Sequence, residues 1–460
     1  MTTLWSGRFA DAPDAAALEW GASFSFDRRM FDDDVTGSIA WARALGNAGL
    51  LPPGEAKQIE EALAEILERG RTDPAFINGS DEDVHSFVER VLVERLGDAG
   101  RRLHTGRSRN EQSSLDLRLY LRRRTPLLQR GVARVVQALA AQAASAGDAL
   151  MPAFTHFRPA QPVLVAHFLL GHAAPLRRDW DRLAAARTEA DALPLGSGAI
   201  AGTSYPIDVD ALARDLGFSR IVANSIDASS DRDFAASFLY ASALAMVHLS
   251  RLAEDLIIFC GDEHHFFELS DALSTGSSMM PQKKNPDPLE LVRGKSGRAV
   301  GHLVSLLTTM KGLPAGYNKD LQEDKQAVFD AEDTLAGCLA VVARAIDGLT
   351  LNRARAEAAA SGMLLATDVA DYLVGRGVPF RRAHEITGAL VRRLVDEQRE
   401  FESLSLAEWR AASDLFEADI ITRVTPRMSV AAKQTPQSTA PGAVAAALRD
   451  VQAWLKRSSA

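Results

Sequence analysis

The segment DRDFAASFLYASALAMVHLSRLAEDLIIFC, residues 231–260, has the most regular apolar spacing in the chain. Its apolar residues recur in steps of three and four, which places them on one face of a helix. This face runs over about eight turns at 3.6 residues each, and so long an apolar face needs several partner helices. The segment therefore predicts one long helix within a bundle. The residues of the apolar face are Phe234, Phe238, Ala241, Ala245, Leu249, Leu252, Leu256 and Phe259.

Helical spacing continues through most of the chain, and alternating strands are nearly absent from the pattern. We therefore expect an all-α protein with three mostly helical domains around a central bundle of long helices. Breaks in the pattern predict an N-terminal domain over 1–106, the bundle over 107–352 and a C-terminal domain over 353–460. Apolar faces of this length also favour a homo-oligomer. The other long helices are expected at 108–145, 161–191, 286–311, 321–349 and 379–400.

The bulk composition of the 460 residues is that of a soluble globular protein, with 47% apolar and 24% charged residues. A net charge of −8 gives no basis for a nucleic-acid or acidic-membrane partner. Two cysteines, Cys260 and Cys338, indicate no disulfide framework and fit a reducing compartment. Residues 1–20 lack the pattern of a signal peptide, and no apolar run is long enough to span a membrane. We expect a cytoplasmic protein.

The segment STGSSMMPQKKNP, residues 274–286, is a polar, cationic loop interrupted by glycine and proline. A serine here could act as nucleophile, carboxylate binder or general base. The sequence is not the G-x-S-x-G elbow of a nucleophile. Serine becomes a base if its alkoxide is stabilised by Lys283 and by the amides of 276–278 when the loop closes. Such a base suits removal of a carbon-bound proton next to a carboxylate.

Two further segments carry residues of chemical interest. LHTGRSRNEQ, residues 103–112, opens a long helix, so its free N–H groups and its arginines suit an anion, although a solvated helix cap has the same pattern. FTHFRPAQP, residues 154–162, places Thr155 beside His156 in a loop bounded by prolines. A histidine there is a surface residue unless a carboxylate orients it, and Glu290 is one choice.

Weaker segments are open to simpler interpretations. GYNKDLQEDK (316–325) and SSDRDF (229–234) read by themselves as helix starts with solvated charges. LGSGAIAG (195–202) is no dinucleotide loop, because no strand precedes it. His264 and His265 are adjacent and do not share a helix face, so no metal site is expected and no cofactor motif is found.

The loop STGSSMMPQKKNP resembles the signature loop of the fumarase/aspartase superfamily, and QKKNP is similar to its argininosuccinate lyase branch. Fumarases and aspartases usually have one lysine followed by valine here, so Lys284 favours that branch. The resemblance runs nearly end to end. The other colinear motifs are LWSGRF, SFSFDRRM, HTGRSRN, THFRPAQP, PLGSGAIAGT, SDRDF, VHLSRLAEDLI and YNKDLQEDK.

This resemblance implies an anti elimination that converts argininosuccinate to fumarate and L-arginine through a carbanion-like intermediate, as in arginine biosynthesis. It implies no cofactor and a homotetramer whose active sites draw loops from three subunits. Ser277 and His156 match the catalytic pair, Glu290 the carboxylate beside the histidine, and Lys283 the loop cation. We favour Ser277 as base and His156, directly or through a water, as acid toward the leaving guanidine nitrogen; the family assigns the two roles between them.

Substrate contacts are also implied by the resemblance, position by position. Two departures from the family pattern affect the shape of the pocket: Glu111 replaces an aspartate, and Phe157-Arg158-Pro159 replaces a leucine-glutamine version. A sister lyase acting on another succinyl or amino acid substrate, and a non-catalytic protein similar to the lens crystallins, are the alternatives. The implied contacts are Ser23, Asn110, Thr155, Asn285, Tyr317, Gln322 and Lys325, with Ser108, Arg109 and Arg232 as further members.

Overall fold

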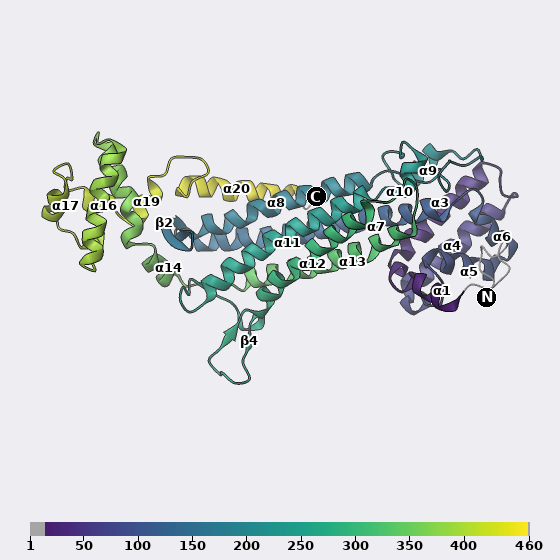
Figure 1. Ribbon diagram of the computed structural model, residues 1–460, viewed down its shortest axis with the longest axis horizontal. Helices are drawn as coiled ribbons and strands as arrows, with labels where there is room; N and C mark the ends of the chain where they lie inside the picture. The colour runs from purple at the N-terminus through teal and green to yellow at the C-terminus, as the bar shows by residue number, and fades with distance from the viewer. Residues whose placement is uncertain (1–13, 459–460) are drawn as a thin grey trace. The chain divides into compact units, whose positions relative to one another are not determined.

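The computed structural model describes residues 14–458, and these are helical apart from short two-stranded pairings (Figure 1). The prediction of an all-α fold is confirmed. The LWSGRF motif lies outside the described residues. The long helices begin and end within a few residues of the predicted windows. They are α7 (Arg109–Ala146), α8 (Val165–Ala190), α11 (Asp233–Cys260), α12 (Asp287–Met310), α13 (Asp324–Asp347) and α16 (Phe380–Asp396).

The apolar face predicted for α11 is buried along its whole length. Each of its eight residues is at most 7% exposed. Burial of this face removes a continuous apolar surface from water at about 25 cal/mol per Å², which is the main driving force for forming a helix of this length.

The chain forms two compact units, each assembled from three separate segments. One unit takes residues 1–128, 182–243 and 298–334, and the other takes 129–181, 244–297 and 335–460. The long helices α7, α8, α11, α12 and α13 each contribute residues to both. The division into three domains at 106 and 352 remains a prediction.

The first unit contains the N-terminal helices, among which α3, α4 and α5 pack against one another (Figure 1). Their core is aromatic: the rings of Phe31 and Phe87 lie 6.1 Å apart, and Trp41 is fully buried. Asp83 caps α5 by accepting a hydrogen bond from Ser86 N. The helices of this unit, besides its parts of the long ones, are α1 (Ala15–Gly21), α2 (Phe24–Asp27), α3 (Phe31–Asn47), α4 (Glu55–Thr72), α5 (Val84–Leu96), α6 (Asp98–Arg101), α9 (Val209–Asp215) and α10 (Ser225–Ser230).

The second unit contains three short antiparallel strand pairs and the C-terminal helices. Around Trp409, buried rings of Phe401 and Phe416 form the core of the C-terminal helices. The strand pairs are β1 (Leu150–Thr155) with β2 (Arg158–Leu164), β3 (Phe267–Glu268) with β6 (Thr350–Leu351), and β4 (Thr275–Gly276) with β5 (Lys284–Asn285). The C-terminal helices are α14 (Arg353–Ala359), α15 (Ala366–Gly375), α16, α17 (Leu406–Ala412), α18 (Ile420–Arg423), α19 (Pro426–Ala431) and α20 (Pro441–Ser458).

Candidate active site

Ser23 is buried in the first unit, directly before α2. Its hydroxyl donates to Asp27 Oδ2 at 2.5 Å, and its main-chain N–H donates to the carbonyl of Glu82 at 2.7 Å. Asp27 Oδ1 in turn accepts from the N–H of Val84 at 2.9 Å. Burial, first of all, raises the pKa of Asp27. These bonds fix Ser23 against the start of α5.

The first turn of α7 carries three of the expected contacts. Arg109 Nη1 donates to Asp83 Oδ2 at 2.9 Å and to Ser86 Oγ at 2.9 Å, so its guanidinium is tied to the cap of α5. Ser108 Oγ accepts from the N–H of Asn110 at 3.2 Å. Asn110 Nδ2 donates to the carbonyl of Ala199 at 3.3 Å. The helix start is therefore held on two sides by side-chain contacts.

Glu111 connects this helix start to the glycine-rich segment that was not expected to bind a dinucleotide. Its Oε2 accepts from the N–H groups of Gly196 at 2.8 Å and Gly198 at 2.9 Å, and its Oε1 accepts from Ser108 N at 3.1 Å. Burial raises the pKa of the carboxyl to about 7, while these N–H groups and Arg107 act in the opposite direction. The segment is thus a support for α7. In the sequence, this contact is indicated by the acidic residue that follows Asn110 and by the glycines of 195–202, whose N–H groups can donate.

Asp324 was not among the site residues expected from the sequence. Its carboxylate accepts from Arg232 Nε and from Lys325 Nζ, the latter at 2.8 Å, and all three side chains are buried. Burial alone would raise the pKa of Asp324, but Lys325 and Arg232 hold it below its ordinary value. Arg232 Nη2 has no partner among the residues that the structure describes. It remains a donor for an anion.

Tyr317 and Gln322 come from the segment that precedes α13. Gln322 Nε2 donates to the carbonyl of Gly21 at 3.2 Å, which brings this segment next to Ser23. Burial raises the pKa of the Tyr317 phenol, and the carboxylates of Asp324 and Asp83 raise it further. The first unit therefore gathers all of its expected contacts around α2, α5, the start of α7 and the start of α13.

Ser277 lies in the second unit, in the loop between β4 and β5 that projects beyond the ends of α11 and α12 (Figure 1). Its Oγ accepts hydrogen bonds from the N–H groups of Met279 at 3.3 Å and Met280 at 3.0 Å. We expected the amides of 276–278 to stabilise an alkoxide of this serine when the loop closes, and this stays a prediction. The donors seen in this structure are the main-chain N–H groups of the two methionines.

The lysines of the loop have different surroundings. Lys284 Nζ binds Glu268 Oε1 at 2.7 Å and the carbonyl of Leu269 at 2.5 Å, and so anchors the base of the loop. Lys283 is exposed, and among the described residues its side chain has no hydrogen bond or ion pair. Asn285 pairs with Thr275 as the last residue of β5. Of the two lysines, Lys283 is the one open to a ligand.

Thr155 and His156 stand at the tip of the β1–β2 hairpin, which replaces the loop expected there. His156 has φ 55° and Phe157 has φ 57°, so two non-glycine residues adopt the left-handed region at the turn. Such conformations cost of order 1–3 kcal/mol each and point to a functional constraint. Glu290 is exposed in the first turn of α12. Within the described part of a single chain, no hydrogen bond or ion pair joins His156 to Glu290 or to Ser277.

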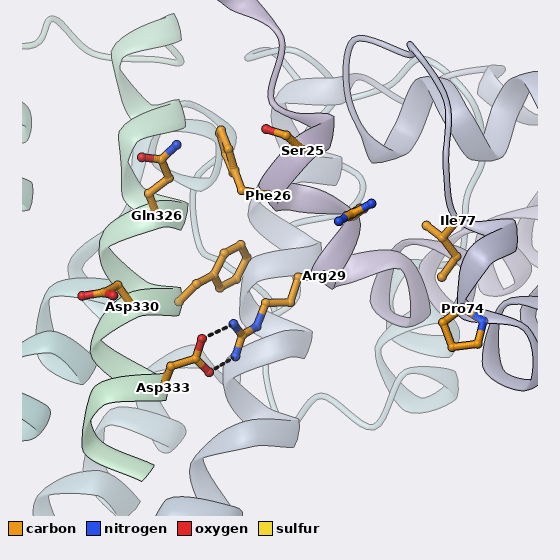
Figure 2. Close-up of a pocket in the computed structure, with 10 residues that line it drawn as sticks. Ser25, Phe26, Arg29, Pro74, Ile77, Gln326, Asp330 and Asp333 are labelled. Atoms are coloured by element: carbon orange, nitrogen blue, oxygen red, sulfur yellow. Dashed lines mark hydrogen bonds and ion pairs between the residues drawn. The ribbon is translucent and has the colours of Figure 1, made fainter. Parts of the chain in front are cut away.

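A pocket in the first unit is lined by none of the expected site residues (Figure 2). Its guanidinium from Arg29 is engaged by Asp333, at 2.6 Å to either carboxylate oxygen. The lining also carries Asp330, which is paired elsewhere with Arg298 and His302. The charges of Arg29 and Asp330 in this pocket are therefore already compensated by neighbouring side chains. It is lined by Ser25, Phe26, Arg28, Arg29, Pro74, Ile77, Gln326, Phe329, Asp330 and Asp333.

Comparison with known proteins covers almost the whole chain. The model of the lyase family matches residues 7–301, and the model described as argininosuccinate lyase C-terminal matches residues 363–431. The argininosuccinate lyase of Moorella thermoacetica is 47% identical over 99% of this chain and 100% of that protein. The chain belongs to the argininosuccinate lyase family. The argininosuccinate lyase of Roseiflexus castenholzii is 48% identical over 96% of this chain and 97% of that protein.

Solved structures share the fold of this chain. EDDS lyase in complex with formate has a TM-score of 0.85 and 26% identity, over 98% of this chain and 92% of that chain. A class II fumarase from Schistosoma mansoni shares the fold, with a TM-score of 0.77 and 15% identity, over 91% of this chain and 95% of that chain. These structures therefore support the all-α fold of this chain.

Proposed function

We propose that this protein cleaves argininosuccinate to fumarate and L-arginine by anti elimination. The observation that carries the proposal is the full-length identity of 46–48% to argininosuccinate lyases. Residues 363–431 also match the model of the argininosuccinate lyase C-terminal family, which supports the same activity. The reaction needs a base, an acid and a ring of groups that hold a dianionic succinyl moiety.

Ser277 serves as the base in this proposal. Two main-chain N–H groups already point at its oxygen, and they stabilise an alkoxide more strongly than a neutral hydroxyl. Lys283 supplies a positive charge from the same loop. The alkoxide takes the proton from the carbon next to a succinyl carboxylate; the electron pair then forms the double bond of fumarate as the C–N bond breaks.

His156 delivers the proton to the leaving guanidine nitrogen. The hairpin turn presents its ring to solvent at the tip of β1–β2, where a ligand can reach it. Glu290 orients the imidazole when the site is assembled. After the reaction Ser277 carries the proton that it removed and His156 has lost the proton that it gave. Proton exchange with water then restores both residues to their starting protonation.

The succinyl carboxylates are bound by the cations and N–H or O–H donors of the remaining positions. Arg232 offers the unpartnered Nη2, and Lys325 is held beside it through Asp324. From the second unit, Thr155 and Asn285 contribute a hydroxyl and an amide. Charged and neutral donors of this kind stabilise the doubly charged intermediate more than the substrate. The other contacts are Ser23, Ser108, Arg109, Asn110, Tyr317 and Gln322.

In this proposal a homotetramer brings together His156, Glu290 and Ser277, which no hydrogen bond or ion pair joins within the described part of one chain. Exposed apolar side chains follow one face of α12: Val300, Val304 and Leu307 are 41–57% exposed. Their spacing of four and three residues keeps them on one side of the helix. A stripe of this kind is typical of a surface covered by another copy. In the proposed homotetramer, His156, Glu290 and Ser277 of different subunits would form one site.

We further place the reaction in the cytoplasm and in arginine biosynthesis. No helix among residues 14–458 combines the length and apolar character needed to cross a membrane. Fumarate and arginine are the products expected from the proposed substrate.

The test follows fumarate by its ultraviolet absorbance after argininosuccinate is mixed with the purified protein. Ser277→Ala should lower kcat by about 10²–10⁴-fold, the usual contribution of a general base. Ser278→Ala, one residue along the same loop, is the matched control and should stay near wild type. Turnover of aspartate or fumarate in place of argininosuccinate would favour a sister lyase. A folded tetramer inactive on all three would favour a non-catalytic role.

A further inference from the structure

Three buried side chains meet behind the start of α7 in the first unit. Asp34 of α3, His85 of α5 and Asp116 of α7 are 1%, 4% and 0% exposed. Asp34 Oδ2 lies 2.6 Å from His85 Nδ1 and accepts from Gln112 Nε2 at 2.6 Å. Asp116 Oδ2 lies 3.3 Å from the same imidazole nitrogen. None of these residues belongs to the site proposed above.

Three of the four carboxyl oxygens of Asp34 and Asp116 lack a hydrogen-bond donor among the described residues. Asp34 Oδ1 and both oxygens of Asp116 have no hydrogen-bond donor among the described side chains and main-chain groups, although the two carboxyl groups are in hydrogen-bonding contact with each other. A buried acceptor without a partner costs about 1–3 kcal/mol, and two adjacent carboxylates repel strongly. A proton on one carboxyl group that is donated to the other supplies a missing hydrogen bond and removes the repulsion between two negative charges.

The surrounding charges decide between a proton and a metal ion. Arg107 and His85 face the pair as cations, while Asp33 of α3 faces it as an anion and is itself engaged by Arg123. His85 Nδ1 lies 2.6 Å from Asp34 Oδ2, and a proton on this nitrogen both donates to that carboxylate and removes Nδ1 as a metal ligand. Two further carboxylates, Asp27 of α2 and Asp83 at the start of α5, also interact with His85.

We propose that Asp116 is a neutral carboxylic acid that donates a hydrogen bond to Asp34, and that this pair positions the first turns of α7. Asp34 then accepts from His85, Gln112 and Asp116, and the cluster leaves no carboxylate oxygen of Asp34 unpaired. Burial first, and then the Asp34 carboxylate, raise the pKa of Asp116 well above its ordinary value, which agrees with this geometry.

The consequence for the site follows from the position of Gln112 and Asp116 on α7. They lie one turn apart, and the same helix begins with Arg109 and Asn110. An ionised Asp116 would repel Asp34 and Asp33 and so push α7 away from α3. Asp116 is in this sense a positioning residue, and this part of the inference rests on the proposed function.

The experiment compares the full chain with Asp116→Asn and Asp34→Asn. A group that keeps its proton in the folded chain but loses it on unfolding makes the protein less stable as pH rises. The Tm of Asp116→Asn minus the Tm of wild type should therefore increase as pH rises from about 5 to 8. Asp34→Asn replaces one of the two acceptor oxygens with an NH₂ donor and should lower Tm throughout. A Tm difference for Asp116→Asn that is constant with pH, or that turns against the variant, would overturn the proposal.

Two further measurements distinguish a shared proton from a bound metal ion. The infrared difference spectrum of wild type minus Asp116→Asn at neutral pH should show the C=O stretch of a protonated carboxylic acid, because the signal of Glu111 is common to both proteins and cancels. Elemental analysis of the purified wild type should find no stoichiometric metal at this cluster. A stoichiometric metal in wild type that is lost in Asp116→Asn would assign the cluster to a cation and refute the proton.

The positioning role is tested with argininosuccinate. Asp116→Ala should raise KM more than it lowers kcat, and Asp116→Asn should restore KM, because its amide can donate to Asp34. Equal loss in both variants would contradict the role. If wild type released no fumarate, the proposed function would fail, while the Tm and infrared measurements would still decide the state of Asp116.

Discussion

The carboxylate of Glu111 accepts a hydrogen bond from the N–H of Gly198 at 2.9 Å, which ties the start of α7 to the glycine-rich segment. The same oxygen accepts from Gly196, and the other oxygen accepts from Ser108. Glu111 stands where the family commonly has aspartate. The longer side chain is therefore accommodated by three main-chain donors, and this arrangement can be tested.

Glu111→Gln should lower kcat/KM for argininosuccinate by about 10-fold. One amide oxygen can still accept from the glycines, but the NH₂ group then faces the N–H of Ser108, and one bond worth about 1.5–3 kcal/mol is lost. Steady-state kinetics measure this, with Glu111→Asp as the variant that keeps the charge. A wild-type value for Glu111→Gln would show that the three N–H groups are satisfied in another way.

The same carboxyl should make stability depend on pH. Burial raises its folded pKa to about 7, above the ordinary value of 4.5, so the folded chain binds this proton more tightly than the unfolded chain. Its contribution to stability is therefore fully present below pH 4.5 and is lost as pH rises through about 7. The Tm advantage of wild type over Glu111→Gln should shrink over that range; an advantage that grows would contradict the raised pKa.

Gly198→Ala should destabilise the first unit by about 1–3 kcal/mol. Gly198 has φ 58°, and a Cβ there would lie 2.6 Å from the carbonyl oxygen of Gly202. Urea unfolding measures the change. Gly388→Ala in α16 is the control, because a Cβ there meets nothing within 4 Å, and alanine favours the helix by about 1 kcal/mol. Equal effects at the two positions would refute the steric argument.

Asp324→Asn should cost about 3–5 kcal/mol near neutral pH, because it leaves the buried charges of Arg232 and Lys325 uncompensated. The folded pKa of Asp324 lies below its ordinary value of 3.8, so the stabilisation is present above that value and is lost as pH falls through the folded pKa. Denaturant titrations at several pH values should show the gap between the two proteins closing in acid. A gap independent of pH would mean that Asp324 is not ionised.

Lys284→Val should change stability by less than about 1 kcal/mol, since its ion pairs with Glu268 and Asp271 are exposed. It should nevertheless slow turnover of argininosuccinate, because Lys284 anchors the base of the Ser277 loop. Assays with argininosuccinate, aspartate and fumarate distinguish anchoring from substrate choice. Gain of activity on aspartate or fumarate would show that Lys284 selects the substrate.

Much of the fold followed from local periodicity. The apolar face of α11 and the ends of the long helices were predictable, because spacings of three and four residues place side chains on one face regardless of what covers it. The hairpin at His156 was not predictable, since left-handed conformations at His156 and Phe157 run against the preferences of both residues.

The sequence by itself determined the helical architecture, the family and the identity of the residues proposed to act on the substrate. Only the tertiary structure decided the partners that lie far apart in the chain: Asp324 for Arg232, and Gly196 and Gly198 for Glu111. The physical reason is that these bonds join residues 85, 87 or 92 positions apart, so no spacing in the sequence indicates them. They form only once separate parts of the chain bring donor and acceptor within about 3 Å.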